Sequence, residues 1–319
     1  MTTASYRGRF APSPTGDLHL GSAAAALVAW LRARQAGGAL VVRIEDIDRP
    51  RIVPGSEGRQ LDDLRWLGID WDEGPNTGGP HAPYRQSERD AHYEAALEAL
   101  AARGLLFRCD CSRAEIALAA SAPHAGDDGP RYPGTCRALG MQPRAWKRPP
   151  AIRLAAPPGS VSIADVFQGP YGHDVAAAAG DFVLRRGDGL WAYQLACVVD
   201  DLAMGMTEVV RGADLLASAP RQVLLARLLG GDAPGFAHLP LIVADDGARL
   251  AKRGGSATLR AHREAGTHPQ VLLGWLAAAL GLRPTAEAVS AADLRAGADL
   301  DALRGRVSAA LPSVPSLRP

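Results

Sequence analysis

The stretch from residue 9 to residue 22 constrains the fold most, because it predicts a strand, a loop and a helix start in one short run. Pro12 and Pro14 cannot continue a helix, and each favours extended backbone in the residue before it. Residues 18–35 are then typical of a long Ala-rich helix. A helix N-terminus presents free N–H groups and a partial positive charge, which suit a phosphate. Gly21, at that end, would let a ring approach the backbone closely.

A buried strand is predicted to follow this helix. Residues 39–45 read Ala-Leu-Val-Val-Arg-Ile-Glu. A strand, a helix and a second strand of these lengths imply a right-handed βαβ unit and a parallel sheet, so the predicted fold class is α/β. Ligands of such sheets lie at the carboxyl ends of the strands, which places Glu45 near the start of the helix. On the residues alone, Glu45 fits a charged turn at a strand end equally well.

The segment Pro12-Ser-Pro-Thr-Gly-Asp-Leu-His-Leu-Gly21 resembles the first ATP motif of class I aminoacyl-tRNA synthetases in its glutamyl/glutaminyl form. Ser22 stands where the general motif ends in histidine. The resemblance covers about residues 7–275 and implies a Rossmann-like fold. It also implies that His19 and Gly21 bind ATP and that His19 is catalytic. The alternative is a Pro/Gly loop before an ordinary surface helix.

A second segment of this kind is Arg249-Leu-Ala-Lys-Arg253. It resembles the second class I motif, a KMSKS-like loop that is typically Lys-Leu-Ser-Lys-Arg in this family, with Arg249 and Ala251 as departures. Lys252 remains, although the chain has only one other lysine, Lys147. A compact ammonium on a flexible loop can follow charge that develops on the α-phosphate of ATP. The resemblance therefore implies a catalytic, ATP-binding Lys252 with Mg²⁺ on the nucleotide. The alternative is a basic surface loop.

The same family implies a set of glutamate contacts. Carried over by motif, they are Arg9, Phe10, Ala11, Pro12, Ser13, Glu45, Tyr193 and Arg211. A glutamate carboxylate needs a fixed, always-charged bidentate donor, which arginine supplies better than lysine. Read alone, Tyr193 is a core aromatic and Arg211 a strand-end charge. Asp200-Asp201 also match the family but receive no role, and Cys197 is interpreted as a core thiol.

Three of the four cysteines lie close together, which favours a zinc site over a disulfide framework. They are Cys109, Cys111 and Cys136. General metal chemistry suggests His124 or Asp127 as a fourth ligand. The pattern Cys-x-Cys…Tyr-x-x-x-Cys resembles the zinc site of glutamyl-queuosine tRNA(Asp) synthetases, which implies Tyr132 instead. Such a four-ligand site leaves no open position, so one structural zinc per chain is expected. The alternative is a group of buried free thiols.

The net charge of +1 gives no global basic field, so contact with RNA must rest on local patches. The basic stretch after the cysteines contains Arg137, Arg144, Lys147, Arg148 and Arg153. It is either a solvated face or a contact for tRNA phosphates. No signal peptide and no membrane-length apolar run are evident. We expect a cytoplasmic monomer without membrane contact.

Four regions are predicted along the chain. They are the first half of the nucleotide-binding domain (1–104), an inserted zinc-binding subdomain at the acceptor end of the tRNA (105–180), the second half of the nucleotide-binding domain (181–255) and a short helical C-terminal region (256–319). Helices are predicted at 55–67, at 87–102 with a capping box from Ser87, at 192–201 and, as three short ones, in 256–304. Further strands are predicted at 105–111, 151–156, 181–191, 207–214 and 239–245.

The sequence ends soon after the second motif, without room for the anticodon-binding domain of ordinary glutamyl-tRNA synthetases. We therefore expect the glutamyl-queuosine type of activity: glutamate is activated by ATP to glutamyl adenylate and passed to the queuosine base of tRNA(Asp). Three alternatives stay open. They are a compact glutamyl-tRNA synthetase that charges a tRNA 3′ end, a non-catalytic tRNA-binding paralogue, and another nucleotidyltransferase of the same superfamily.

Overall fold

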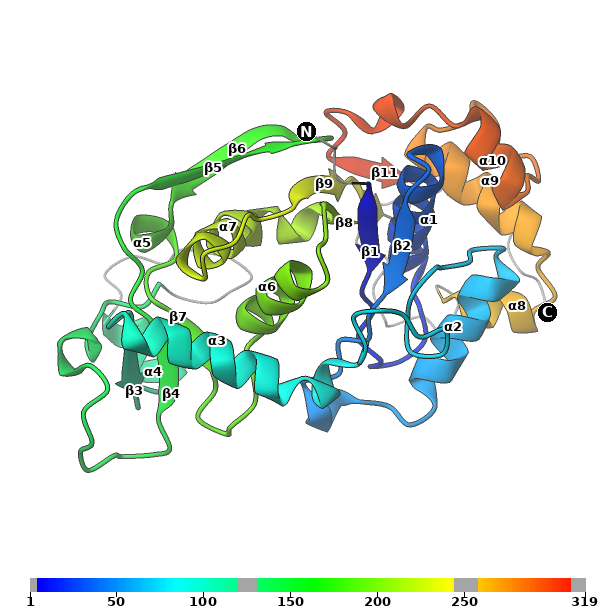
Figure 1. Cartoon of the computed structure of the whole chain (residues 1–319). Coiled ribbons are helices and arrows are strands. Elements are labelled where there is room, and N and C mark those ends of the chain that lie inside the picture. The colour runs from blue at the N-terminus through cyan, green and yellow to red at the C-terminus, as the bar shows by residue number, and fades with distance from the viewer. Residues whose placement is uncertain (1–4, 120–130, 244–257, 311–319) are drawn as a thin grey trace.

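A parallel four-stranded sheet forms the centre of the molecule (Figure 1). The computed structural model describes residues 5–119, 131–243 and 258–310. The strand order is β2-β1-β8-β9, and every neighbouring pair is parallel. The strands are β1 (Arg7–Phe10), β2 (Ala39–Val42), β8 (Glu208–Gly212) and β9 (Gly235–Leu239). The predicted α/β fold with a parallel sheet is confirmed.

Helix α1 (Leu20–Gln35) connects β1 to β2 and lies in the middle of the protein core. It contacts the sheet through β1, β2 and β8, and it contacts the C-terminal helices α9 (Pro269–Leu280) and α10 (Ala291–Gly297). A helix covered on more than one side must be apolar around most of its circumference, which accounts for its Ala-rich sequence.

The C-terminal region packs on this side of the sheet, as Figure 1 shows. Three short helices occur there as predicted, the first being α8 (Leu259–Glu264). Leu272, Leu273, Leu276 and Leu280 of α9 are fully buried, which confirms their predicted core role. A 3₁₀ helix, η6 (Leu300–Leu303), and a final strand, β11 (Ser308–Ala310), follow. Strand β11 pairs with β10 (Leu241–Val243) in a separate parallel pair.

The three-stranded sheet of the inserted region lies at the opposite end of the molecule from α9 and α10, and the hairpin of residues 160–174 reaches back to β9 (Figure 1). The three-stranded sheet is antiparallel and has the order β3-β4-β7. The elements are β3 (Leu106–Cys109), α4 (Arg113–Ala119), η3 (Arg137–Leu139), β4 (Ala151–Leu154), the hairpin β5 (Ser160–Asp165) with β6 (Gly169–Asp174), α5 (Val175–Ala178) and β7 (Phe182–Arg185). The strand that was expected to resume the nucleotide-binding fold, β7, pairs with β4 instead. The division at residue 181 stays a prediction.

Seven further helical elements complete the described part of the chain. They are η1 (Arg49–Arg51), α2 (Ser56–Trp66), η2 (Gln86–Glu88), α3 (Asp90–Ala102), α6 (Tyr193–Ala203), η4 (Ala213–Ser218) and α7 (Ala219–Leu228). The capping box predicted from Ser87 is wrong. Its backbone N–H and its hydroxyl both donate to the Asp46 carboxylate, at 2.8 and 2.6 Å. A carboxylate from a distant segment therefore takes the backbone N–H that a capping box would have used.

The strand predicted at 239–245 is also wrong in its bounds. Strand β9 ends at Leu239, and β10 begins only at Leu241, in a different sheet. Pro240 separates them, because proline has no N–H to give to a sheet. Residues 244 and 245 lie outside the described part of the chain. Within the described ranges, no helix is long and apolar enough to cross a membrane.

Candidate active site

A cavity of about 770 Å³ opens at the carboxyl ends of the parallel strands, where sheets of this kind bind ligands. Every described residue that was predicted to bind glutamate or ATP lines it: Arg9, Phe10, Ala11, Pro12, Ser13, His19, Gly21, Glu45, Tyr193 and Arg211. The structure therefore brings these residues together, and their binding roles stay predictions. Lys252, with Arg249 and Ala251, lies outside the described residues.

The N-terminus of α1 forms one wall of this cavity. His19 is the N-cap, with extended backbone (φ −78°, ψ 160°), and the first turn contains no acidic residue. No carboxylate of that turn therefore offsets the positive end of the helix dipole, which stays available to an anion. At Gly21, a Cβ atom would meet nothing within 4 Å, so the backbone here borders open space.

Arg211 reaches the cavity from β8 and is held on several sides. Its Nε donates to His238 Nε2 at 2.9 Å, Nη1 donates to Gln222 Oε1 at 2.7 Å and Tyr193 Oη at 3.3 Å, and Nη2 donates to the Leu215 carbonyl at 3.3 Å. A guanidinium has five N–H groups, so among the described residues these four bonds leave one N–H unused. Burial raises the pKa of Tyr193, so its hydroxyl stays neutral at physiological pH.

A buried ionic network lies beneath the cavity. Arg9 Nε and Arg43 Nη1 both donate to Asp201 Oδ1, at 3.2 and 2.7 Å, and Arg43 Nη2 pairs with Glu45 Oε1 at 3.1 Å. Burial opposes ionisation of Asp201, but the two guanidinium groups lower its pKa overall. The Cys197 thiol, interpreted as a plain core group, is buried and also donates to Glu45 Oε1 at 3.1 Å.

Asp200, which received no role from the sequence, has a structural one. Its carboxylate accepts from Arg89 at 2.6 Å, Gln86 at 2.8 Å and the Tyr93 hydroxyl at 2.9 Å, and all four groups are buried. It thereby fixes the start of α3 against α6. The neighbouring Asp201 pairs with Arg9 and Arg43, and Arg43 Nε also lies 3.7 Å from Asp200 Oδ2, so Arg43 links the two aspartates.

Sequence reasoning missed three residues near the cavity: Arg43, Asp165 and His238. Arg43 and His238 are polar residues within apolar strand segments, and both are fully buried. That contrast is a usable sequence signal, because a buried charge or ring nitrogen needs a partner. Asp165 gives no such signal, because it is the last residue of an ordinary alternating strand.

The three clustered cysteines meet at one point in the inserted region. Their sulfur atoms all lie within 4.8 Å of one another, and Cys111 Sγ is 3.6 Å from Cys136 Sγ. Tetrahedral zinc with Zn–S bonds of about 2.3 Å places two sulfurs about 3.8 Å apart, so this spacing fits the ion. The Tyr132 hydroxyl lies 3.4 Å from Cys109 Sγ, where a fourth ligand could stand. His124 and Asp127 lie outside the described residues.

The ionisation of these thiols depends on their burial and on one another. Burial raises the pKa of Cys111 to about 12, and its two sulfur neighbours add to the effect. At Cys109, burial opposes ionisation, but hydrogen bonds from the Tyr132 hydroxyl and the Cys111 backbone lower the pKa overall. Without a cation, several adjacent thiolates would repel one another, and a divalent metal reverses that balance.

The basic stretch next to the cysteines is largely paired within the protein. Arg144 and the Lys147 backbone N–H both donate to Asp110, which is buried between the two cysteines of the Cys-x-Cys pair, at 2.6 and 3.0 Å. The side chains of Lys147 and Arg148 both pair with Glu115. These cations thus brace the cysteine cluster, and their contact with tRNA phosphates stays a prediction.

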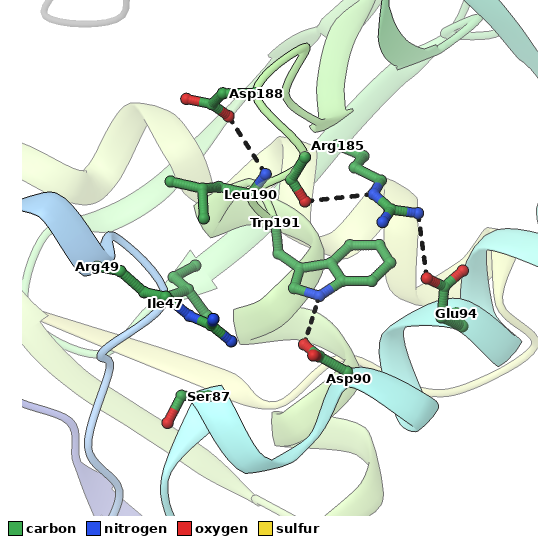
Figure 2. Close-up of a pocket in the computed structure, with 10 residues that line it drawn as sticks. Ile47, Arg49, Ser87, Asp90, Glu94, Arg185, Asp188, Leu190 and Trp191 are labelled. Atoms are coloured by element: carbon green, nitrogen blue, oxygen red, sulfur yellow. Dashed lines mark hydrogen bonds and ion pairs between the residues drawn. The ribbon is translucent and has the colours of Figure 1, made fainter.

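A second cavity, of about 280 Å³, lies where residues 47–49, α3 and the turn after β7 meet (Figure 2). Trp191 forms one side, and its indole Nε1 donates to Asp90 at 2.8 Å. Arg185 lies over the Trp191 ring and donates to Glu94 at 3.1 Å. Trp191 lines this cavity and Tyr193, two residues later, lines the larger one.

Comparison with known proteins identifies the class that this fold and cavity belong to. The family described as tRNA synthetases class I (E and Q), catalytic domain, matches residues 5–293. A glutamate tRNA ligase structure from Elizabethkingia meningosepticum, in complex with its amino acid, superposes with a TM-score of 0.82 at 30% identity. The match covers 97% of this chain and 67% of that one. The chain is thus a class I synthetase catalytic domain of the glutamyl and glutaminyl group.

Within that class, this chain belongs to the glutamyl-Q tRNA(Asp) synthetase family. A relative of that name from Symbiobacterium thermophilum is 52% identical over 292 residues, which is 90% of each chain. Another from Nitratidesulfovibrio vulgaris is 50% identical over 282 residues, or 87% of each.

Proposed function

We propose that this protein activates glutamate with ATP and transfers it to the queuosine base of tRNA(Asp). The observation that carries the proposal is the cavity at the carboxyl edge of the sheet. In it, two buried arginines, Arg9 and Arg211, line the same space as the N-terminus of α1. Two fixed cations suit an amino acid with two carboxylates, and a helix N-terminus suits a phosphate. Relatives that are about half identical and bear the name of this activity support the same reaction.

In the first step, a glutamate α-carboxylate oxygen attacks the α-phosphorus of ATP. The bond from that phosphorus to the bridging oxygen breaks, and pyrophosphate leaves. ATP enters as its magnesium complex, with its adenosine end near Gly21 and its phosphates near His19. Lys252 would oppose the negative charge that develops on the α-phosphate. The step needs no general base and no covalent protein intermediate, so positioning and electrostatics supply the rate.

The glutamate side chain and ammonium group are proposed to contact the remaining cavity residues. Arg211, braced as described, would bind one carboxylate through its remaining N–H, beside the Tyr193 hydroxyl. Glu45 carries a negative charge held in place by Arg43 and Cys197, and it suits the substrate ammonium. The backbone of residues 10–13 would close the cavity over the amino acid.

In the second step, a nucleophile of the queuosine base attacks the adenylate carbonyl carbon, and AMP leaves with the C–O–P oxygen. The inserted region is proposed to hold one structural zinc through Cys109, Cys111, Cys136 and Tyr132. Zinc would cross-link β3 to the segment before η3 and so shape the surface that meets tRNA. Because such ligation needs reduced thiols, we place the protein in the cytoplasm, and we propose that it works as a monomer.

Two assays test this function. Glutamate-dependent ATP–pyrophosphate exchange reports the first step. Transfer of labelled glutamate to tRNA with and without queuosine, with the label followed to the nucleoside, reports the second. Queuosine-dependent label on tRNA(Asp) supports the proposal. Label on a tRNA 3′ end would make the protein a compact glutamyl-tRNA synthetase, and folded protein with no exchange would exclude the activity.

A further inference from the structure

A buried pair of side chains stands behind Arg211, away from the cavity. His238, on β9, accepts from Arg211 Nε at 2.9 Å through its Nε2 atom. On its other side, His238 Nδ1 lies 2.5 Å from Asp165 Oδ2. Both side chains are completely buried. Asp165, His238 and Arg211 therefore form one chain that begins in the inserted hairpin and ends in the cavity.

The run of hydrogen bonds from Asp165 through His238 to Arg211 determines which imidazole nitrogen carries the proton. A carboxylate can only accept, so Nδ1 must carry the hydrogen that points to Asp165. The guanidinium Nε–H can only donate, so Nε2 must keep its lone pair. Only one of the two neutral tautomers satisfies both partners, and the doubly protonated ring would set an N–H against the Arg211 N–H. The tautomer is assigned here from these partners.

We propose that Asp165 and His238 are positioning residues that lock the Arg211 guanidinium in the orientation that binds glutamate. The inference rests on the proposed function, because it takes Arg211 as a glutamate ligand. Neither residue lines the cavity, so neither would touch the substrate. Their effect would pass through the Nε–H bond, which sets the plane of the guanidinium and so the direction of its remaining N–H.

The ionisation of the pair agrees with this arrangement. Burial lowers the pKa of His238, and the Arg211 charge lowers it further against the opposing effects of Asp165 and the Leu215 backbone, so the ring is neutral at physiological pH. Burial opposes ionisation of Asp165, but hydrogen bonds from His238 and from two backbone N–H groups lower its pKa overall. A neutral ring between a carboxylate and a guanidinium is what the hydrogen-bond order requires.

Asp165→Asn separates positioning from folding. Oδ1 of Asp165 accepts from the backbone N–H groups of Phe167, Gln168 and His238, at 2.9 to 3.1 Å, and an asparagine oxygen can keep all three bonds. The asparagine NH₂ would then face His238 Nδ1 and favour the opposite tautomer. That tautomer places an N–H against Arg211 Nε–H, as happens when a catalytic-triad aspartate is replaced by asparagine.

The expected result is a rise of at least about tenfold in the KM for glutamate in ATP–pyrophosphate exchange, with the KM for ATP changed less than about twofold. Asp174→Asn is the matched control, because Asp174 is half-buried on the other strand of the same hairpin and accepts from the backbone N–H groups of Gly159 and Ala177 rather than from His238. It should leave both KM values unchanged. In an Arg211→Lys background, which lacks the Nε–H, Asp165→Asn should add less than about twofold to the KM for glutamate.

Nitrogen NMR of histidine-labelled protein gives a readout that does not depend on activity. The His238 resonances should show a protonated Nδ1 and a bare Nε2 in the wild type, and the reverse in Asp165→Asn. A protonated Nε2 in the wild type would overturn the inference. Absence of exchange in the wild type would instead overturn the proposed function, and the NMR result would still decide the tautomer.

Two kinetic outcomes would also overturn the inference: an unchanged KM for glutamate in Asp165→Asn, or an equal rise in the Arg211→Lys background. If Asp165→Asn does not fold, His238→Gln and His238→Leu replace it. Glutamine keeps an acceptor for Arg211 Nε–H and leucine does not, so the KM for glutamate should be several-fold lower in the glutamine variant. Equal values would count against positioning.

Discussion

Removing one buried charge beneath the cavity should cost far more stability than removing one at the surface. Asp201 is the shared partner of Arg9 and Arg43, and its side chain is only 7% exposed. Asp201→Asn keeps an oxygen where both arginines donate, because both bonds go to Oδ1. The variant therefore removes the charge while the hydrogen bonds can remain.

The magnitude follows from burial. Removing one partner of a buried ion pair costs about 3–5 kcal/mol, because a buried charge loses its compensation. We expect about 3 kcal/mol, the lower end, because the asparagine oxygen retains both bonds. Asp62→Asn is the control, since Asp62 pairs with Arg65 at 3.5 Å and both side chains are at least half exposed. That change should cost no more than about 0.5 kcal/mol.

Urea unfolding followed by circular dichroism measures both values. The pKa of Asp201 is lowered in the folded protein, so its contribution is present above the unfolded-state pKa and is lost as pH falls through the folded pKa. The stability difference between the wild type and Asp201→Asn should therefore hold at neutral pH and shrink only in acid, below about pH 4. The reasoning is refuted if Asp201→Asn and Asp62→Asn cost the same at pH 7.

Three further substitutions have expected outcomes. Gly21→Ala should unfold at no lower temperature than the wild type, because the added Cβ enters open space. Its KM for ATP should nevertheless rise several-fold. A stable variant with an unchanged KM for ATP would contradict the proposed nucleotide-binding position. Gly274→Ala should cost about 1–3 kcal/mol in urea, because its Cβ would lie 2.2 Å from the Glu287 carbonyl oxygen, and equal stability would contradict that close approach. Cys111→Ser should lose the zinc found by metal analysis and melt earlier, whereas Cys197→Ser should keep it; zinc retained in both would remove Cys111 from the ligand set.

Local signals in the sequence predicted the first βαβ unit and its loop well. Two prolines, a long apolar helix and a short apolar strand act over a few residues, so they can be recognised without knowing the fold. Strand partners cannot be recognised in this way. The residues of β7 are as suitable for the central sheet as for β4, and only the three-dimensional path of the chain decides between them. The same holds for Ser87, whose hydroxyl bonds to Asp46 rather than to its own helix.

The same distinction between local and long-range information applies to the candidate site. The residues that line the cavity belong to short motifs, so a family resemblance could point to each of them. Asp165 lies 46 residues before Arg211 and acts on it only through His238. This indirect contact depends on two strands from different sheets meeting in space. The sequence of either strand does not indicate that the other will lie beside it. Only the structure could therefore reveal that Asp165 and His238 lie behind Arg211.

The hairpin β5–β6 limits which segments of this protein can be exchanged with those of a relative. It packs on β9, and Gln168, in its turn, donates to the carbonyl groups of His238 and Arg306. A chimera that exchanged residues 105–180 as a cassette between relatives would replace Asp165, the partner of His238 behind Arg211, as well as the surface at the far end. A chimera designed to change the tRNA that is recognised should therefore retain the hairpin of the recipient protein. Exchanging the hairpin as well would be expected to alter amino-acid selection at the same time.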